Sequence, residues 1–283
     1  MENKAIYHSP KLAQLKQEKK KKSKRKLFIF LSIFIVFIIG LIFLANWKEI
    51  NIDNVNVTGN KIIESKEIED IIHKNLSGKY LWLIPKTNGL LYPEDKILDE
   101  LHNKYKRINT LEIDTNDFKT LDVTLTENIA SYTWCGDTQV VDATEESCYF
   151  IDKDGYVFDK APNFSGDVYY RFYGEIKKQN DSPIGFYFMP KIFNNLINFK
   201  QVLDNIKLET SSIFVKGKDT EISLKKNNNA KIIFKTNDDL IQIGQNIQSS
   251  VLTDPLKSRI EKEYDSLLYI DLRFDNKVYY KFK

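Results

Sequence analysis

A long apolar run follows the first residues of the chain. Residues 27–45 read LFIFLSIFIVFIIGLIFLA and carry no charge. A helix of this length is about 28 Å long, which matches the hydrocarbon core of a bilayer. A cleaved signal peptide would have a shorter apolar region that ends at a small-x-small site, and Ala45-Asn46-Trp47 is a poor site of that kind. The pattern predicts an uncleaved transmembrane helix.

The next 80 residues change their hydrophobic period several times. Alternation predicts strands, and a return of apolar residues every three or four positions predicts helices. The first helix has Ser65 as its expected N-cap and Gly78 as its stop, and the second has Pro93 in its first turn. The expected elements are a strand over 50–57, a helix over 65–77, a short apolar patch at 81–84, a helix from 93 to about 105, and strands over 108–114 and 121–126.

The second half of the chain is richer in short alternating segments. Turn residues such as Lys153-Asp154-Gly155 separate several of them, which is typical of hairpins. The expected strands are 148–152, 156–160, 167–174, 211–216, 219–225, 230–235, 267–274 and 277–283, with helices over 191–206, 238–252 and 256–264. The turns at 227–229 and 275–276 join the last strands. The sequence therefore predicts an α+β fold.

The charge of the chain is unevenly distributed. Residues 1–26 hold ten Lys or Arg and two Glu, whereas the rest holds 32 basic and 37 acidic residues. Basic residues beside a membrane span stay on the cytoplasmic side, so we expect the N-terminus inside and the C-terminal part outside. The outside part is mildly acidic, which argues against nucleic-acid binding.

Catalytic signatures are missing from the sequence. No G-x-S-x-G, H-E-x-x-H, P-loop or Rossmann fingerprint occurs. His73 and His102 occupy polar positions of the predicted helices, and His8 lies on the other side of the membrane, so solvated surface histidines are favoured over a catalytic or metal site. Residues 152–155 match part of a calcium loop, but the flanking strands favour a turn. We expect no catalytic residue, metal or cofactor.

Cys135 and Cys148 are the two cysteines, and both lie in the outside part. Outside the membrane a disulfide is allowed, and two short strands would bring the cysteines within bridging distance. Such a bridge would add about 2–3 kcal/mol to the free energy of unfolding. The alternative is two unpaired thiols, and the sequence leaves both open.

Three segments behind this anchor resemble the cell-division family called FtsQ, or DivIB in many Gram-positive bacteria. Residues 52–61, IDNVNVTGNK, resemble the opening strand and Gly-Asn turn of that family's POTRA domain. Residues 149–158, YFIDKDGYVF, resemble its D-x-x-G-x-V/I-F hairpin. Residues 268–274, LYIDLRF, with 275–278 after them, resemble its closing I-D-L-R-x-x-N-x-V segment. The resemblance covers about residues 25–283.

The chain also departs from the family pattern. Residues 116–119 stand where the family often has an Arg and a Pro, and Glu127-Asn128 replaces a common Glu-Arg pair. The cysteine pair is not a hallmark of the family. The chain thus resembles a divergent member.

The resemblance implies four parts. They are a cytoplasmic basic tail over 1–26, a transmembrane helix over 27–45, a β-α-α-β-β POTRA domain over 48–128, and a β-domain over 129–283 that has a curved mixed sheet with helices on one face. Members are scaffolds of the divisome and not enzymes. They bind the small coiled-coil membrane proteins FtsB (DivIC in Gram-positives) and FtsL, and they help regulate septal peptidoglycan synthesis. We therefore expect a single-pass protein of the cytoplasmic membrane, at the division septum.

The last strand is the expected binding site. Val278, Tyr279, Tyr280, Lys281 and Phe282 form a terminal strand with little chain after it. A partner segment adds to such an edge through backbone hydrogen bonds, and the aromatic residues would serve as anchors. The alternative for this segment is an ordinary terminal strand whose aromatic side chains fill the core.

Three other classes of protein compete with the scaffold. A membrane-anchored extracytoplasmic hydrolase would gather His, Ser and acidic residues around a pocket. A POTRA-containing translocation or chaperone component would carry tandem POTRA copies and a barrel pattern. A transmembrane sensor would need more than 26 residues for a cytoplasmic output domain.

Overall fold

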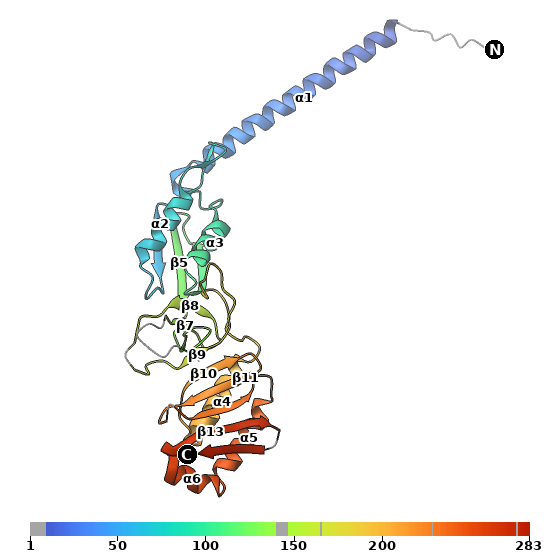
Figure 1. The fold of residues 1–283 in the computed structure, drawn as a ribbon. Helices are drawn as coiled ribbons and strands as arrows, with labels where there is room; N and C mark the ends of the chain where they lie inside the picture. Colours follow the sequence, from blue (N-terminus) through green and yellow to red (C-terminus); the bar gives the residue numbers. More distant parts are fainter. Residues whose placement is uncertain (1–9, 140–146, 165, 228, 276) are drawn as a thin grey trace, which may run out of the picture. The chain divides into compact units, whose positions relative to one another are not determined.

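The computed structural model describes residues 10–139, 147–164, 166–227, 229–275 and 277–283, with side chains described from Lys19 onward. Helix α1, Pro10–Ala45, begins well before the predicted residue 27 and includes the basic run (Figure 1). Residues 1–9 of the predicted tail lie outside the described residues. Within the described chain, the part of α1 from Lys19 to Ala45 is the one helix long and apolar enough to cross a membrane.

The chain divides into two compact units, each treated by itself below. The first unit contains residues 1–103 and 110–125, and the second contains residues 104–109 and 126–283. The break after Leu125 lies close to the predicted boundary at 128. The short segment 104–109 belongs to the second unit, although the sequence places it inside the first domain.

The first unit combines helices with a small sheet. Among the described residues this sheet has three strands in the order β1-β5-β4, and β1 runs parallel to β5. A separate ribbon, β2-β3, lies between the helices in the chain. The elements are η1 Lys48–Ile50, β1 Asn54–Thr58, α2 Ser65–Leu76, β2 Lys79–Tyr80, β3 Ile84–Pro85, α3 Glu94–Lys104, β4 Ile108–Thr115 and β5 Thr120–Glu127. The predicted order of strand, two helices and two strands is therefore present, with the β2-β3 ribbon added.

Local contacts test the turn and the helix N-cap that the sequence predicts in this unit. Gly59 has a φ of +86°, and a Cβ there would lie 2.0 Å from the Leu125 carbonyl oxygen, so this turn requires glycine. The predicted N-cap at Ser65 is wrong. Glu64 precedes the first turn of α2, and the Ser65 hydroxyl instead accepts a hydrogen bond from Asn60 at 3.0 Å. The extended backbone of Glu64 takes the cap position without a side-chain bond.

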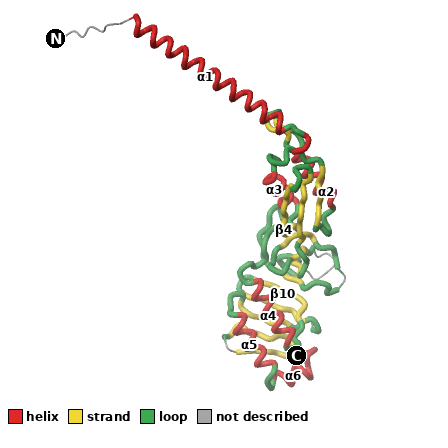
Figure 2. Tube along the Cα trace, turned by 180° about the vertical axis from the view of Figure 1, so that it is seen from behind, coloured by secondary structure: helices red, strands yellow, loops and turns green. Residues whose placement is uncertain are grey.

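The second unit is built on a large mixed sheet. Its nine strands, counted over the described residues, follow the order β14-β13-β12-β11-β10-β9-β6-β7-β8. Helices α4 Phe193–Asn205, α5 Leu240–Val251 and α6 Leu256–Glu263 cover one face of this sheet (Figures 1 and 2). The strands are β6 Tyr132–Trp134, β7 Tyr149–Ile151, β8 Val157–Lys160, β9 Arg171–Tyr173, β10 Thr210–Lys216, β11 Asp219–Leu224, β12 Lys231–Lys235, β13 Leu267–Phe274 and β14 Lys277–Phe282, with η2 Tyr264–Ser266 before β13.

The last strands and helices match the predicted ranges to within two residues at each end. Strand β9 is shorter than predicted, and β6 was not predicted. The turn residues Asn228 and Asn276 lie outside the described residues. In the hairpin between β7 and β8, one carboxylate oxygen of Asp152 accepts the N–H groups of Asp154 and Tyr156 at 2.8 and 2.9 Å. Asp152 therefore stabilises a turn, as predicted.

Apolar side chains from the sheet and its helices form the core of the second unit. The sequence periods predict these positions because every second strand residue and every third or fourth helix residue points inward. The largest fully buried side chains in this core are Phe172, Phe188, Phe193, Phe199 and Phe234. This core extends to the last strand, where Phe282 is buried.

Candidate functional site at the β14 edge

Strand β14 is the last strand at one end of the large sheet. It pairs antiparallel with β13, and Ile270 lies opposite Tyr280. Among the described residues no strand pairs with its other side. The predicted docking segment is therefore an edge strand of a well-ordered sheet.

The backbone of β14 presents alternate residues to the open side. Lys283 donates its N–H to the Ser266 carbonyl at 2.8 Å, on the β13 side. Successive residues of an antiparallel strand direct their backbone groups to opposite sides. The extra residues at both register shifts lie in β13, so β14 itself alternates regularly. We infer that the N–H and C=O groups of Val278, Tyr280 and Phe282 face the open side.

The same three residues turn their side chains toward the core. Phe282 is only 6% exposed, and its ring lies edge-to-face with that of Tyr280 at 6.0 Å. The guanidinium carbon of Arg259, on α6, lies 4.1 Å from the Phe282 ring centroid. Val278 and Tyr280 are partly buried against the core. These side chains hold β14 in place, while their backbone groups remain available.

The opposite face of β14 is exposed to solvent. Tyr279 is 47% exposed and packs edge-to-face on Phe274 at 5.1 Å between centroids. Lys281 is exposed on the same face. Beside the β13-β14 turn lies a shallow hollow whose lining includes three cationic side chains. Its lining residues are Lys235, Arg273, Phe274, Asp275, Lys277 and Tyr279.

An ion-pair cluster fixes β13 next to this edge. Arg273 binds Asp271 through two bonds of 2.6 and 2.9 Å and reaches Asp219 at 3.1 Å. Burial raises the pKa of Asp271, but the hydrogen bonds from Arg273 outweigh it and leave that pKa below its ordinary value. The bonds to Asp271 raise the pKa of Arg273. The cluster stays charged at neutral pH and holds the exposed face of β13 in a defined geometry.

The structure divides the predicted anchors into two groups. Tyr279 and Lys281 present their side chains to solvent, whereas Phe282 is a core residue and offers only its backbone. The prediction of Phe282 as an aromatic anchor therefore needs correction, because the strand alternates and α6 covers its inner face. Sequence reasoning also missed Arg273, Asp271 and Arg259 as supports of the edge. The D-L-R spacing in 271–273 was the available signal for the first pair.

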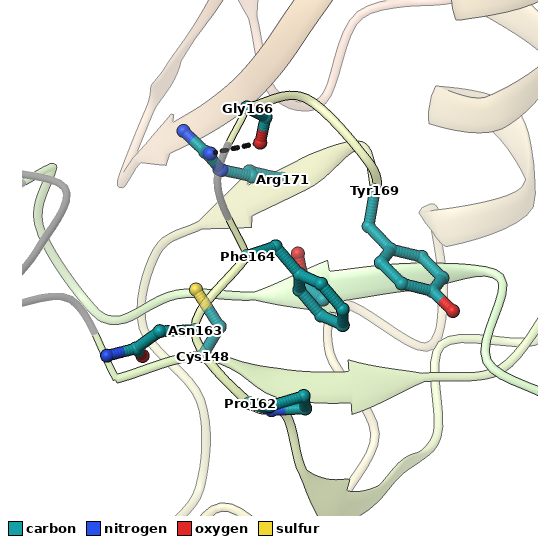
Figure 3. Close-up of a pocket in the computed structure, with 8 residues that line it drawn as sticks. Cys148, Pro162, Asn163, Phe164, Gly166, Tyr169 and Arg171 are labelled. Atoms are coloured by element: carbon teal, nitrogen blue, oxygen red, sulfur yellow. Dashed lines mark hydrogen bonds between the residues drawn. The ribbon is translucent and has the colours of Figure 1, made fainter.

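The cysteine pair lies at the other side of the sheet. Cys135 follows β6, Cys148 precedes β7, and the structure joins their sulfur atoms at 2.06 Å. A small cavity of about 20 Å³ lies beside Cys148, with Phe164 and Tyr169 in its lining and Arg171 bound to the Gly166 carbonyl at 3.0 Å (Figure 3). That volume holds about one water molecule, so the cavity is too small for a polymeric substrate.

His73 and His102, the other residues considered for chemistry, belong to the first unit. His73 is exposed on α2 and His102 is exposed on α3, where its Nδ1 lies 3.1 Å from the Leu98 carbonyl oxygen. In the described part of the chain, no group of three His, Cys, Asp or Glu side chains is placed to hold a metal ion.

Comparison with models of known protein families finds no match, and comparison with curated proteins finds none either. The resemblance to the FtsQ family thus depends on the three segments that carry it, and the geometry of the β14 edge is the basis for a functional proposal.

Proposed function

We propose that this chain is a bitopic, non-catalytic scaffold of the bacterial division machinery. In this proposal α1 crosses the cytoplasmic membrane with its basic end inside, residues 48–128 are a POTRA domain, and residues 129–283 form the β-domain at the septum. The open edge of β14 receives a strand from an FtsB- or DivIC-like protein, which acts together with an FtsL-like protein. Through them the scaffold helps regulate septal peptidoglycan synthesis.

The observation that carries the proposal is the unpaired side of β14. A row of backbone groups on an edge strand is a template for strand addition, and the exposed side chains beside it supply specificity. Tyr279 and Lys281 lie on the exposed face, where they would contact alternate side chains of an added strand. Their aromatic and cationic chemistry suits an apolar segment flanked by acidic residues.

The first experiment is an affinity purification of the full-length protein from its own membranes. We expect two single-pass coiled-coil proteins to co-purify. If neither is present and the purified protein instead degrades cell-wall fragments, the scaffold proposal is wrong and the anchored hydrolase replaces it.

A second experiment locates the contact on β14. Tyr280→Pro removes an N–H that we place on the open side and leaves the β13 ladder intact, since proline is tolerated at such edge positions. We expect capture of the partner to fall about 10-fold, because one backbone hydrogen bond to the partner is lost and the pyrrolidine ring of proline blocks the edge. Tyr280→Phe keeps the N–H and the ring, so it serves as the matched control. Equal capture by both variants, with both folded, would remove β14 as the docking edge.

A further inference from the structure

The β2-β3 ribbon exposes its most apolar side chains. Tyr80 pairs with Ile84, and the three residues between them form the tip. Leu81 is 84% exposed, Trp82 is 91% exposed and Leu83 is 50% exposed. Large apolar side chains gathered on one exposed tip mark an interaction site.

The backbone at this tip has an unusual conformation. Leu81 has a φ of +46° and Trp82 a φ of +62°, which is the left-handed region that bulky residues rarely adopt. A Leu-Trp pair at such positions, where glycine or asparagine is favoured, indicates that the side chains serve a purpose other than turn formation.

Hydrogen bonds tie this ribbon to the end of α1. Asn46, the first residue after the helix, donates its side-chain N–H to the Leu83 carbonyl at 2.9 Å. Asn88, which follows β3 and is buried, donates to the Ala45 carbonyl at 3.0 Å. Asn51 accepts from the Thr87 hydroxyl at 2.9 Å. The tip is therefore held beside the residue where the apolar run of α1 ends.

The residues around the tip are those that favour the boundary between lipid and water. Tyrosine and tryptophan concentrate at that boundary, and lysine reaches from it to phosphate groups. Tyr80 precedes the tip, and Lys79 and Lys86 flank the ribbon at its base, where the Lys86 N–H binds the Gly78 carbonyl at 3.1 Å. Just after the end of α1, Trp47 and Lys48 repeat this aromatic-basic combination.

We propose that residues 80–84 are a second membrane contact, and that they rest at the boundary between headgroups and acyl chains in the leaflet from which α1 emerges. The bilayer is the occupant because the tip is fixed to the end of an apolar helix, so its exposed side chains continue the apolar surface of that span. The inference rests on α1 crossing a bilayer and is independent of the division partners. With two attachments, the first unit is held at the membrane in a restricted orientation.

The test is lipid quenching of tryptophan in the full-length protein, reconstituted in nanodiscs that contain brominated phosphatidylcholine and phosphatidylglycerol. Trp82 emission is the difference between the Trp47→Phe protein and the Trp47→Phe, Trp82→Phe protein. Trp47 emission is the difference between the Trp82→Phe protein and the same Trp47→Phe, Trp82→Phe protein. We expect brominated lipid to quench Trp82 about as strongly as Trp47.

Ile62→Trp, introduced into the protein that lacks Trp47 and Trp82, is the matched control. Ile62 is also exposed. It follows Gly59, which lies against Leu125 at the end of the small sheet that is farther from α1. We expect no lipid quenching there. If Trp47 is quenched and Trp82 is quenched no more than this control, the tip proposal is wrong while the span stands. If neither is quenched, the span itself is wrong. If lipid does not quench Trp82 but native membranes shield it from acrylamide, a protein covers the tip and the lipid proposal is overturned.

Discussion

The two edges of the large sheet differ in how their backbone groups are satisfied. On β8, Val157 donates its N–H to the Phe186 carbonyl at 2.9 Å and accepts the N–H of Gly185 at 2.7 Å. Arg107 holds Asp159 of the same strand at 2.7 Å. A loop thus takes the place of a further strand at β8, whereas the described residues provide no such cover for β14. Since open edges promote association, covering only one of them directs association to the other.

Covalent support also favours the covered side. The Cys135–Cys148 bond connects the ends of β6 and β7, next to β8 in the sheet. The open side instead depends on noncovalent contacts, namely the buried row of β14 and the Arg273 cluster on β13. The open edge is therefore held by packing and charge, and removing each support in turn tests this difference.

The largest effect is expected from Phe282→Ala. Phe282 is buried beneath Arg259, and removing a buried phenyl ring typically costs about 3–5 kcal/mol in the free energy of unfolding. We expect a loss near the lower end of that range, since the strand lies at the edge of the core. Chemical denaturation of the full-length protein in detergent, followed by near-ultraviolet circular dichroism, measures it.

Tyr279→Ala is the control for this change. It removes a ring of similar size from the neighbouring position but from the exposed face, so we expect a change within about 0.5 kcal/mol. Similar losses for both variants would mean that the two faces of β14 contribute equally and that the inner row does not hold the edge.

A smaller effect is expected on the covered side. Replacing Cys135 and Cys148 together by alanine removes the bond across β6 and β7, which should lower the free energy of unfolding by about 2–3 kcal/mol. Amides of β14 that exchange through local opening should exchange at the same rate in this variant as in the unchanged protein. If loss of the disulfide accelerates exchange of the β14 amides as strongly as it accelerates exchange of the β7 amides, the two sides of the sheet are not independent.

How far the sequence predicts this molecule depends on how local each signal is. Strands β11 to β14 were predicted to within one residue at each end, because strict alternation and short polar turns bound them. Strand β6 was missed because it has three residues and no hairpin turn marks it, whereas the turn at 153–155 marks β7, which is equally short. Strand β9 was overestimated because residues 167–170, which end in two tyrosines, resemble a strand, whereas 166–169 form bends.

The sequence predicted which residues form the candidate site, but it did not predict which of their side chains are exposed. Alternation in 278–282 shows that two faces exist, but only the position of α6 decides that Phe282 is buried and Tyr279 is exposed. Likewise, nothing local shows that 81–83 forms an exposed tip, because its position depends on Asn46 and Asn88, which lie on either side of it in the chain. Contacts between residues distant in sequence set these features.

The smallest change in the free energy of unfolding is expected from Asp271→Asn, which tests the charged support of the open side. The pKa of Asp271 in the folded protein is lowered by Arg273, so its contribution to stability is complete above its unfolded pKa of about 3.9 and is lost as pH falls through the lower folded value. Asp271→Asn should cost about 1–2 kcal/mol at pH 7, the usual value of hydrogen bonds to a charged group. The difference between the two proteins in the free energy of unfolding should then shrink as pH falls below about 4. A difference that stays constant with pH would mean that Arg273 depends on the two oxygen atoms of the Asp271 side chain and not on their charge. In that case the cluster supports β13 by shape alone, and protonation of Asp271 would not weaken the open edge.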